Sequence, residues 1–298
     1  MNLFTFIYII GIFILLNIFE GFKEISIENQ LLYSSLSILL FGIPHGAIDH
    51  IIFFKKRNIT QLKFYLIYIG LIIGFVLMWH IAPVLSLVLF LLISAFHFGE
   101  SQFEDIRLNK ILKNSFYFFW GIALLATLIF YNLKELANVT AYFDDTLILE
   151  KVYDIKNVTI LFYFTNIVTL SSMIMLFIYK KIKIERLLSE FFLLFLIHVT
   201  FYLFPFIIGF TLYFVVLHSL KVMQDEIEFF KKDNPEFSFL DFLKLLAPYS
   251  ILSIFFTTIL LLLSYYSYIP YSIPFLSIII ISVITLPHAI VMNIFYNE

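Results

Sequence analysis

Long apolar runs separated by short polar stretches make up most of the chain. Ten of these runs have the roughly 17–25 residues that a helix needs to cross a bilayer. Because the bilayer core holds no water to satisfy backbone groups, we expect each run to be helical. The expected spans are residues 3–19, 31–54, 62–80, 84–101, 114–132, 158–181, 187–204, 206–222, 246–269 and 273–295. This pattern predicts an all-α fold, a polytopic transmembrane helix bundle of about ten spans.

Two of the expected boundaries between spans are marked only by a proline. Pro83 and Pro205 each follow an apolar run, and proline does not continue a helix from the preceding turn. The longest polar stretches, residues 134–156 and 221–244, are too short to form a soluble domain. We therefore expect residues 1–298 to form a single integral membrane domain.

The composition supports lipid as the solvent. The mean hydropathy is +0.99, with 62% hydrophobic and 13% charged residues. A soluble domain carries about 25% charged residues, and a globular core of this size could not bury so much apolar surface. The net charge is −2 and no basic block is present, so nucleic acid is not an expected partner.

The distribution of basic residues predicts the orientation of the spans. If the ten spans alternate in direction, 15 of the 19 Lys and Arg residues fall in one set of loops and four in the other. Cytoplasmic loops are the ones enriched in Lys and Arg. We therefore expect a multi-pass protein of the inner (plasma) membrane with both termini in the cytoplasm.

Four of the seven histidines share an unusual placement within the spans. Ionisable residues inside a membrane are costly and usually functional, although any single one can serve only an interhelical hydrogen bond. On our map the four lie on spans of the same direction, about 5–15 Å from the cytoplasmic boundary. We therefore expect them to share one depth and one metal ion. They are His45, His97, His218 and His288.

The other three histidines do not fit this pattern. His80 and His198 map to the opposite half of their spans. His50 follows His45 by five residues, which turns it to a different face of a helix. We expect His80 and His198 to tolerate replacement.

The available ligand types restrict the metal chemistry. There is no cysteine, which excludes thiolate sites, and a site of four imidazoles suits iron, copper or zinc. A ligand imidazole needs a hydrogen-bond partner that fixes its tautomer. Asp49, four residues after His45, is our best candidate for that role, unless it pairs with a neighbouring helix. Glu100 and Ser219 are weaker candidates, and we expect Glu100 to mark the end of its span.

The settings of these histidines resemble the motifs of the Brp/Blh family of β-carotene 15,15′-dioxygenases. The segment Pro44-His45-Gly46-Ala47-Ile48-Asp49 is similar to the first motif of that family and His97-Phe98-Gly99 to the second. Residues 211–221, which contain His218, resemble the third, and Leu286-Pro287-His288 resembles a Pro-His near the C-terminus of the family. The four stand in the family's order and bracket residues 42–290.

The resemblance implies an iron(II) enzyme that uses O₂ to split β-carotene at its central double bond. The product would be two molecules of retinal, for use by a rhodopsin, and histidines would hold the iron. β-Carotene dissolves in the bilayer, so a lipid-accessible tunnel of Phe, Tyr and Leu would suit it. Two positions depart from the family: Val222 replaces a frequent second histidine, and Gln102 a frequent aspartate. The first departure favours His288 as the fourth ligand, or leaves a three-histidine site.

Three other readings remain open on the sequence. A membrane desaturase or hydroxylase would need clustered histidine boxes, and the seven histidines here form none. A proton-coupled transporter could use intramembrane His and Asp, but the spans show no clear inverted repeat. A haem protein with paired axial histidines is the third. Metal analysis of the purified protein would separate these readings.

Overall fold

The computed structural model describes residues 2–18 and 26–297, and every regular element within them is helical. Nine helices in these residues are long and apolar enough to cross a membrane, and α1 (Leu3–Ile18) is a shorter apolar helix. The predicted all-α polytopic bundle is thereby confirmed. Residue 19, the predicted end of the first span, lies outside the described residues.

Both proline-marked boundaries are present. Helix α4 ends at Ile81 and α5 begins at Pro83, while α9 ends at Leu203 and α10 begins at Phe206. Proline is tolerated in the first turn of a helix, where its missing N–H would have no intrahelical acceptor. Each proline therefore separates two helices without leaving a backbone donor unsatisfied.

The chain divides into two compact units. Unit 1 comprises Met1–Ile48 and Leu170–Ile254, and unit 2 comprises Asp49–Thr169 and Phe255–Glu298. The chain passes from one unit to the other at three points, namely after Ile48 and within the two long helices α8 (Ile155–Ile178) and α12 (Phe239–Tyr265).

In unit 1, helix α10 and the π-helical segment η4 lie against the N-terminal elements. Gly11 of α1 permits this approach, since a Cβ there would stand 2.7 Å from a methyl carbon of Leu212. Ser34 of α2 donates a hydrogen bond to the carbonyl of Ile207 (3.5 Å). Besides α1, the elements of this unit are α2 (Ile27–Ser37), η1 (Ile38–Gly42), η2 (Pro44–Gly46), α9 (Ile184–Leu203), α10 (Phe206–Leu212), η4 (Tyr213–Ser219) and α11 (Leu220–Asp233).

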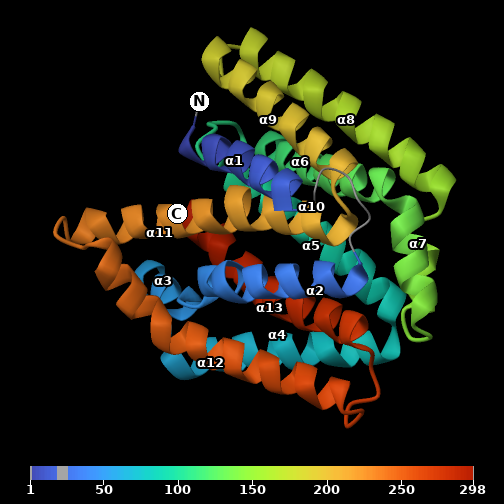
Figure 1. The fold of residues 1–298 in the computed structure, drawn as a ribbon. Helices are drawn as coiled ribbons and strands as arrows, with labels where there is room; N and C mark the ends of the chain where they lie inside the picture. The colour runs from blue at the N-terminus through green and yellow to red at the C-terminus, as the bar shows by residue number, and fades with distance from the viewer. Residues whose placement is uncertain (1, 19–25, 298) are drawn as a thin grey trace. The chain divides into compact units, whose positions relative to one another are not determined.

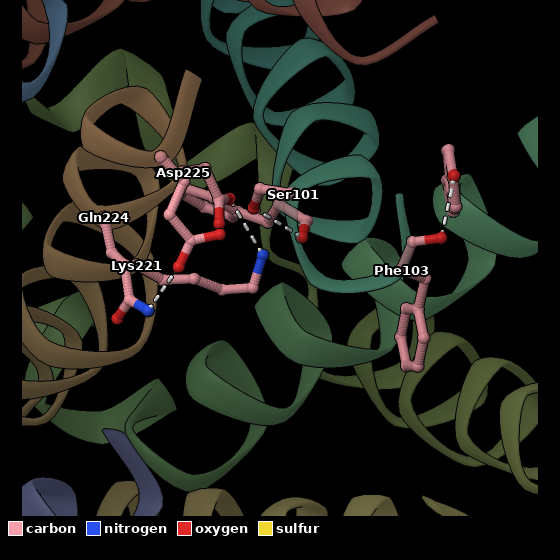
Figure 2. Close-up of polar contacts among 8 residues, drawn as sticks. Ser101, Phe103, Lys221, Gln224 and Asp225 are labelled. Carbon is pink, nitrogen blue, oxygen red and sulfur yellow. Dashed lines mark hydrogen bonds and ion pairs between the residues drawn. The ribbon is translucent and has the colours of Figure 1, made fainter. Parts of the chain in front are cut away.

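The helical run that starts at α10 continues beyond the predicted end at residue 222. It extends as one apolar helix from Phe206 to Asp233. Its polar last part is stabilised by side-chain pairs four residues apart, such as the ion pair between Lys221 Nζ and Asp225 Oδ2 (3.1 Å; Figure 2). Apolar length alone therefore underestimates this helix.

In unit 2, helix α13 lies along α3, α4 and α5, and α5 packs against α6 (Figure 1). The indole of Trp79 in α4 donates to the hydroxyl of Ser282 in α13 (2.7 Å). The elements of this unit are α3 (Asp49–Lys56), α4 (Gln61–Ile81), α5 (Pro83–Phe103), α6 (Lys110–Tyr131), α7 (Leu133–Tyr142), η3 (Leu147–Val152) and α13 (Ile273–Asn297).

The approach of α5 to α6 depends on two glycines. A Cβ on Gly99 would stand 2.0 Å from the carbonyl oxygen of Tyr117, and one on Gly121 would stand 1.7 Å from that of Ala95. Small residues allow helix backbones to come this close in membranes. The tyrosine side chain adds a further tie, since the Tyr117 hydroxyl donates to the carbonyl of Phe103 (2.9 Å).

The polar stretch at residues 134–156 forms a short helical cap of α7 and η3. Leu149 of η3 is buried in one apolar cluster with Phe75 and Phe275. The carboxylate of Asp145 accepts a hydrogen bond from the backbone N–H of Ser272 (2.6 Å). The cap therefore closes one end of the α4 and α13 helices, and it is too small to be a soluble domain.

Candidate functional site

The helix that carries His45 is interrupted just before the histidine. In the π-helical turn η1 the N–H of Ile43 bonds the carbonyl of Ile38 (2.8 Å). Pro44 has no N–H, and the N–H of Gly46 turns to the carbonyl of Ile43 (3.4 Å). These changes leave the Gly42 carbonyl without its helical donor, and Nδ1 of His45 donates to it. The local sequence thus sets both the position of the imidazole and its tautomer.

His218 is placed by the second π-helical segment, η4. The N–H of Leu220 there bonds the carbonyl of Val215, one residue further back than in an α-helix. The ring centroid of His218 lies 5.2 Å from that of His45, and both rings contact Phe214. Gly42 makes room for this phenyl ring, since a Cβ there would stand 2.9 Å from it. Unit 1 therefore holds a buried pair of histidines.

Unit 2 holds a second buried pair on α5 and α13. The ring centroids of His97 and His288 lie 5.0 Å apart, with the rings nearly perpendicular. His97 is 1% exposed and His288 is 3% exposed, so both rings are removed from lipid and water. Both helices are fixed by close packing, α5 on α6 and α13 on α5.

Asp49 holds one ring of the second pair. Nδ1 of His288 donates to Asp49 Oδ1 (2.8 Å), and the Tyr68 hydroxyl donates to Asp49 Oδ2 (3.0 Å). The sequence suggested Asp49 as a partner of His45, on the assumption of one continuous helix. The turn between η2 and α3 breaks that helix, and the bonded partner within unit 2 is His288.

The remaining histidines lie outside both pairs. Nδ1 of His80 bonds the hydroxyl of Tyr271 (3.1 Å), and His80 is exposed. The ring of His50 lies 6.3 Å from that of Tyr65. His198 is only partly buried, on α9.

Glu100 has a more specific environment than the end of a span. It is fully buried, and its Oε1 accepts hydrogen bonds from Nδ2 of Asn293 (2.6 Å) and Nδ2 of Asn297 (2.7 Å). Sequence reasoning did not select these two amides, nor Tyr68. Asn293 could have been found as a polar residue inside an apolar run, whereas Asn297 lies beyond the predicted end of that run. Tyr68 could not, because it is one of 18 tyrosines in the chain.

The donor set suits a divalent metal ion. All four predicted ligands are buried imidazoles. A carbonyl and a carboxylate can only accept hydrogen bonds from a ring, so Nδ1 carries the proton in His45 and in a neutral His288. Nε2 is then the ligand atom of both, an arrangement common among metal-bound histidines. The residues therefore fit a divalent metal ion such as iron, copper or zinc, with no thiolate needed.

Comparison with known proteins gives two matches. A family profile described as beta-carotene 15,15'-dioxygenase matches residues 36–296. A protein of that name from uncultured marine bacterium 66A03 is 40% identical over 78 residues, covering 24% of this chain and 28% of the relative. The chain thus aligns with little more than a quarter of that relative's length. No solved structure matches the chain.

Proposed function

We propose that this chain, which belongs to the β-carotene 15,15′-dioxygenase family, cleaves β-carotene with O₂ at the central double bond. The observation that carries the proposal is the family match, which spans all four candidate ligands. The reaction balances without a reductant, since the carbon–carbon double bond breaks and each half receives one oxygen atom as an aldehyde. The products are two molecules of retinal, and a rhodopsin is the recipient that we propose.

We further propose that iron(II) is the cofactor and that His45, His97, His218 and His288 hold it. Bound iron(II) would supply the one-electron chemistry that lets O₂ react with a closed-shell alkene. The Gly42 carbonyl and the Asp49 carboxylate orient the rings of His45 and His288. Val222, where family members often carry a histidine, is fully buried and supplies no donor, which favours His288 as the fourth ligand.

We also propose the cellular setting. The apolar helices suit a multi-pass protein of the inner membrane, and the bias of basic residues favours cytoplasmic termini. β-Carotene reaches such a protein from the bilayer. The apolar surroundings of the site exclude water, which would otherwise compete with the polyene.

The test is product analysis with purified protein in detergent, iron(II), O₂ and β-carotene. Retinal as the sole aldehyde supports the proposal, and replacement of any of the four histidines by Ala should abolish both retinal formation and bound iron. His80→Ala is the matched control and should keep both. Longer apocarotenals would show cleavage at another bond. Failure of folded, iron-loaded protein to cleave several carotenoids would favour a desaturase or a transporter.

A further inference from the structure

Glu100 is a buried carboxylate that the proposed reaction does not use. It is 0% exposed in α5, inside an apolar helix, where an ionisable side chain is costly. Among the described residues, both hydrogen bonds recorded for its carboxylate reach Oε1, and Oε2 is buried with no hydrogen-bond partner. A carboxylate that served only to join two helices would not need to leave one oxygen unsatisfied.

The position of Glu100 relates it to the second histidine pair. It follows His97 by three residues on α5, so the two Cβ atoms are about 5–6 Å apart on one helix face. Its amide partners Asn293 and Asn297 belong to α13, the helix of His288. The carboxylate is therefore built between the same two helices as the pair.

The cation Lys113 reaches this carboxylate only through an amide. Lys113 Nζ donates to Asn297 Oδ1 (3.2 Å), and Asn297 Nδ2 in turn donates to Glu100. Two amide donors stabilise an ionised carboxylate while leaving its charge uncompensated. Such an arrangement suits a carboxylate whose counter-charge is supplied by a ligand.

A metal held by neutral imidazoles needs negative charge nearby. Four neutral histidines leave the two positive charges of iron(II) uncompensated, and burial in an apolar medium makes this unfavourable. Within the described part of unit 2, the buried carboxylates are Asp49 and Glu100. Asp49 already bonds His288. The other two buried carboxylates of the described residues are Glu190 and Glu226, in unit 1. Glu190 pairs with Arg186 (3.1 Å), and Glu226 follows His218 by eight residues, about 12 Å along the same helix.

We propose that Glu100 is a positioning residue of the metal site. Asn293 and Asn297 hold it beside His97, and its carboxylate supplies the second negative charge that balances the metal ion, the first being that of Asp49. This inference rests on the proposed function. It predicts that the charge of Glu100, and not only its hydrogen bonds, sets the affinity for iron(II).

The test compares two substitutions with opposite properties. Glu100→Gln removes the charge but keeps an oxygen that can accept from both amides. Glu100→Asp keeps the charge but shortens the reach to them. The affinity of the folded protein for iron(II) is measured in detergent, by metal analysis at limiting iron. It should fall at least about tenfold in Glu100→Gln and less in Glu100→Asp. The control, Asp105→Asn, removes an exposed carboxylate just past α5 and should bind as the wild type does.

Each outcome decides the inference. Wild-type affinity in Glu100→Gln, or weaker binding by Glu100→Asp than by Glu100→Gln, would show that Glu100 only joins the helices, and the proposed function would stand. A wild-type protein that binds no iron would overturn the proposed function and this inference together. If Glu100→Gln does not fold, the decision passes to Glu100→Asp, whose binding should stay within a few fold of wild type, and a loss of tenfold or more would contradict the inference.

Discussion

At the scale of single residues, two histidines are oriented by different kinds of acceptor. His45 bonds a backbone carbonyl, whereas His288 bonds the side chain of Asp49. Asp49 is in turn held by Tyr68, so the orientation of the His288 ring depends on two other side chains. The ring of His288 is therefore the one that substitutions can disturb without touching a ligand.

Tyr68→Phe should weaken iron(II) binding by up to about tenfold, and Asp49→Asn by about 10–100-fold, because each removes part of the support of His288. The phenylalanine ring keeps the packing of Tyr68 and loses only the hydroxyl. Iron bound per protein at limiting iron(II) measures the effect. Tyr65→Phe, on an exposed tyrosine of the same helix, should leave binding unchanged. Equal binding by the Tyr68 variant would mean that Asp49 needs no second donor.

At the scale of helices, the contact of α5 with α6 fixes the position of His97 and Glu100. This contact is made by backbones, because the atom opposite Gly99 is a carbonyl oxygen and not a flexible side chain. An added methyl group can therefore be accommodated only if the helices separate.

Gly99→Ala should destabilise the protein by about 3 kcal/mol or more, since overpacking against a backbone cannot be relieved by a rotamer change. Thermal unfolding in detergent, with and without iron(II), measures the loss. Gly74→Ala is the control, because nothing lies within 4 Å of a Cβ there. It should be neutral or stabilising by up to about 1 kcal/mol through helix propensity. A neutral Gly99→Ala would contradict the close approach of α5 to α6.

The spans were predictable from the sequence, whereas the neighbours of each helix were not. Long apolar runs determine where helices form, and Pro83 and Pro205 mark two of the boundaries. Which helices meet depends on contacts such as Gly99 with Tyr117, which no periodicity reveals. The sequence therefore selected the four histidines by depth but could not group them as His45 with His218 and His97 with His288. Their convergence on one metal stays a prediction.

At the scale of the whole molecule, the distribution of basic residues predicts the orientation of the spans. Fifteen of the 19 basic residues fall on one side if the ten apolar helices alternate. The cap formed by α7 and η3 then lies on the opposite side, between α6 and α8. The single integral membrane domain expected for residues 1–298 also stays a prediction.

Reporter fusions after Lys113 and within residues 134–156 should report opposite sides of the membrane, with the first cytoplasmic. The reason is the excess of Lys and Arg in the loops assigned to the cytoplasm. An alkaline phosphatase fusion and a fluorescent protein fusion at each point provide reciprocal controls. The same side for both points would rule out the alternation and, with it, the shared depth of the four histidines.

The two π-helical segments also restrict how the length of this chain can change. Each places one more residue in a turn than an α-helix does, next to His45 in η1 and around His218 in η4. Deleting one residue from either would let an α-helix close and would remove the wide turn that places the neighbouring histidine. Alignments of functional relatives should therefore carry no gap across residues 38–46 or 213–219, even where the loops between helices vary freely in length.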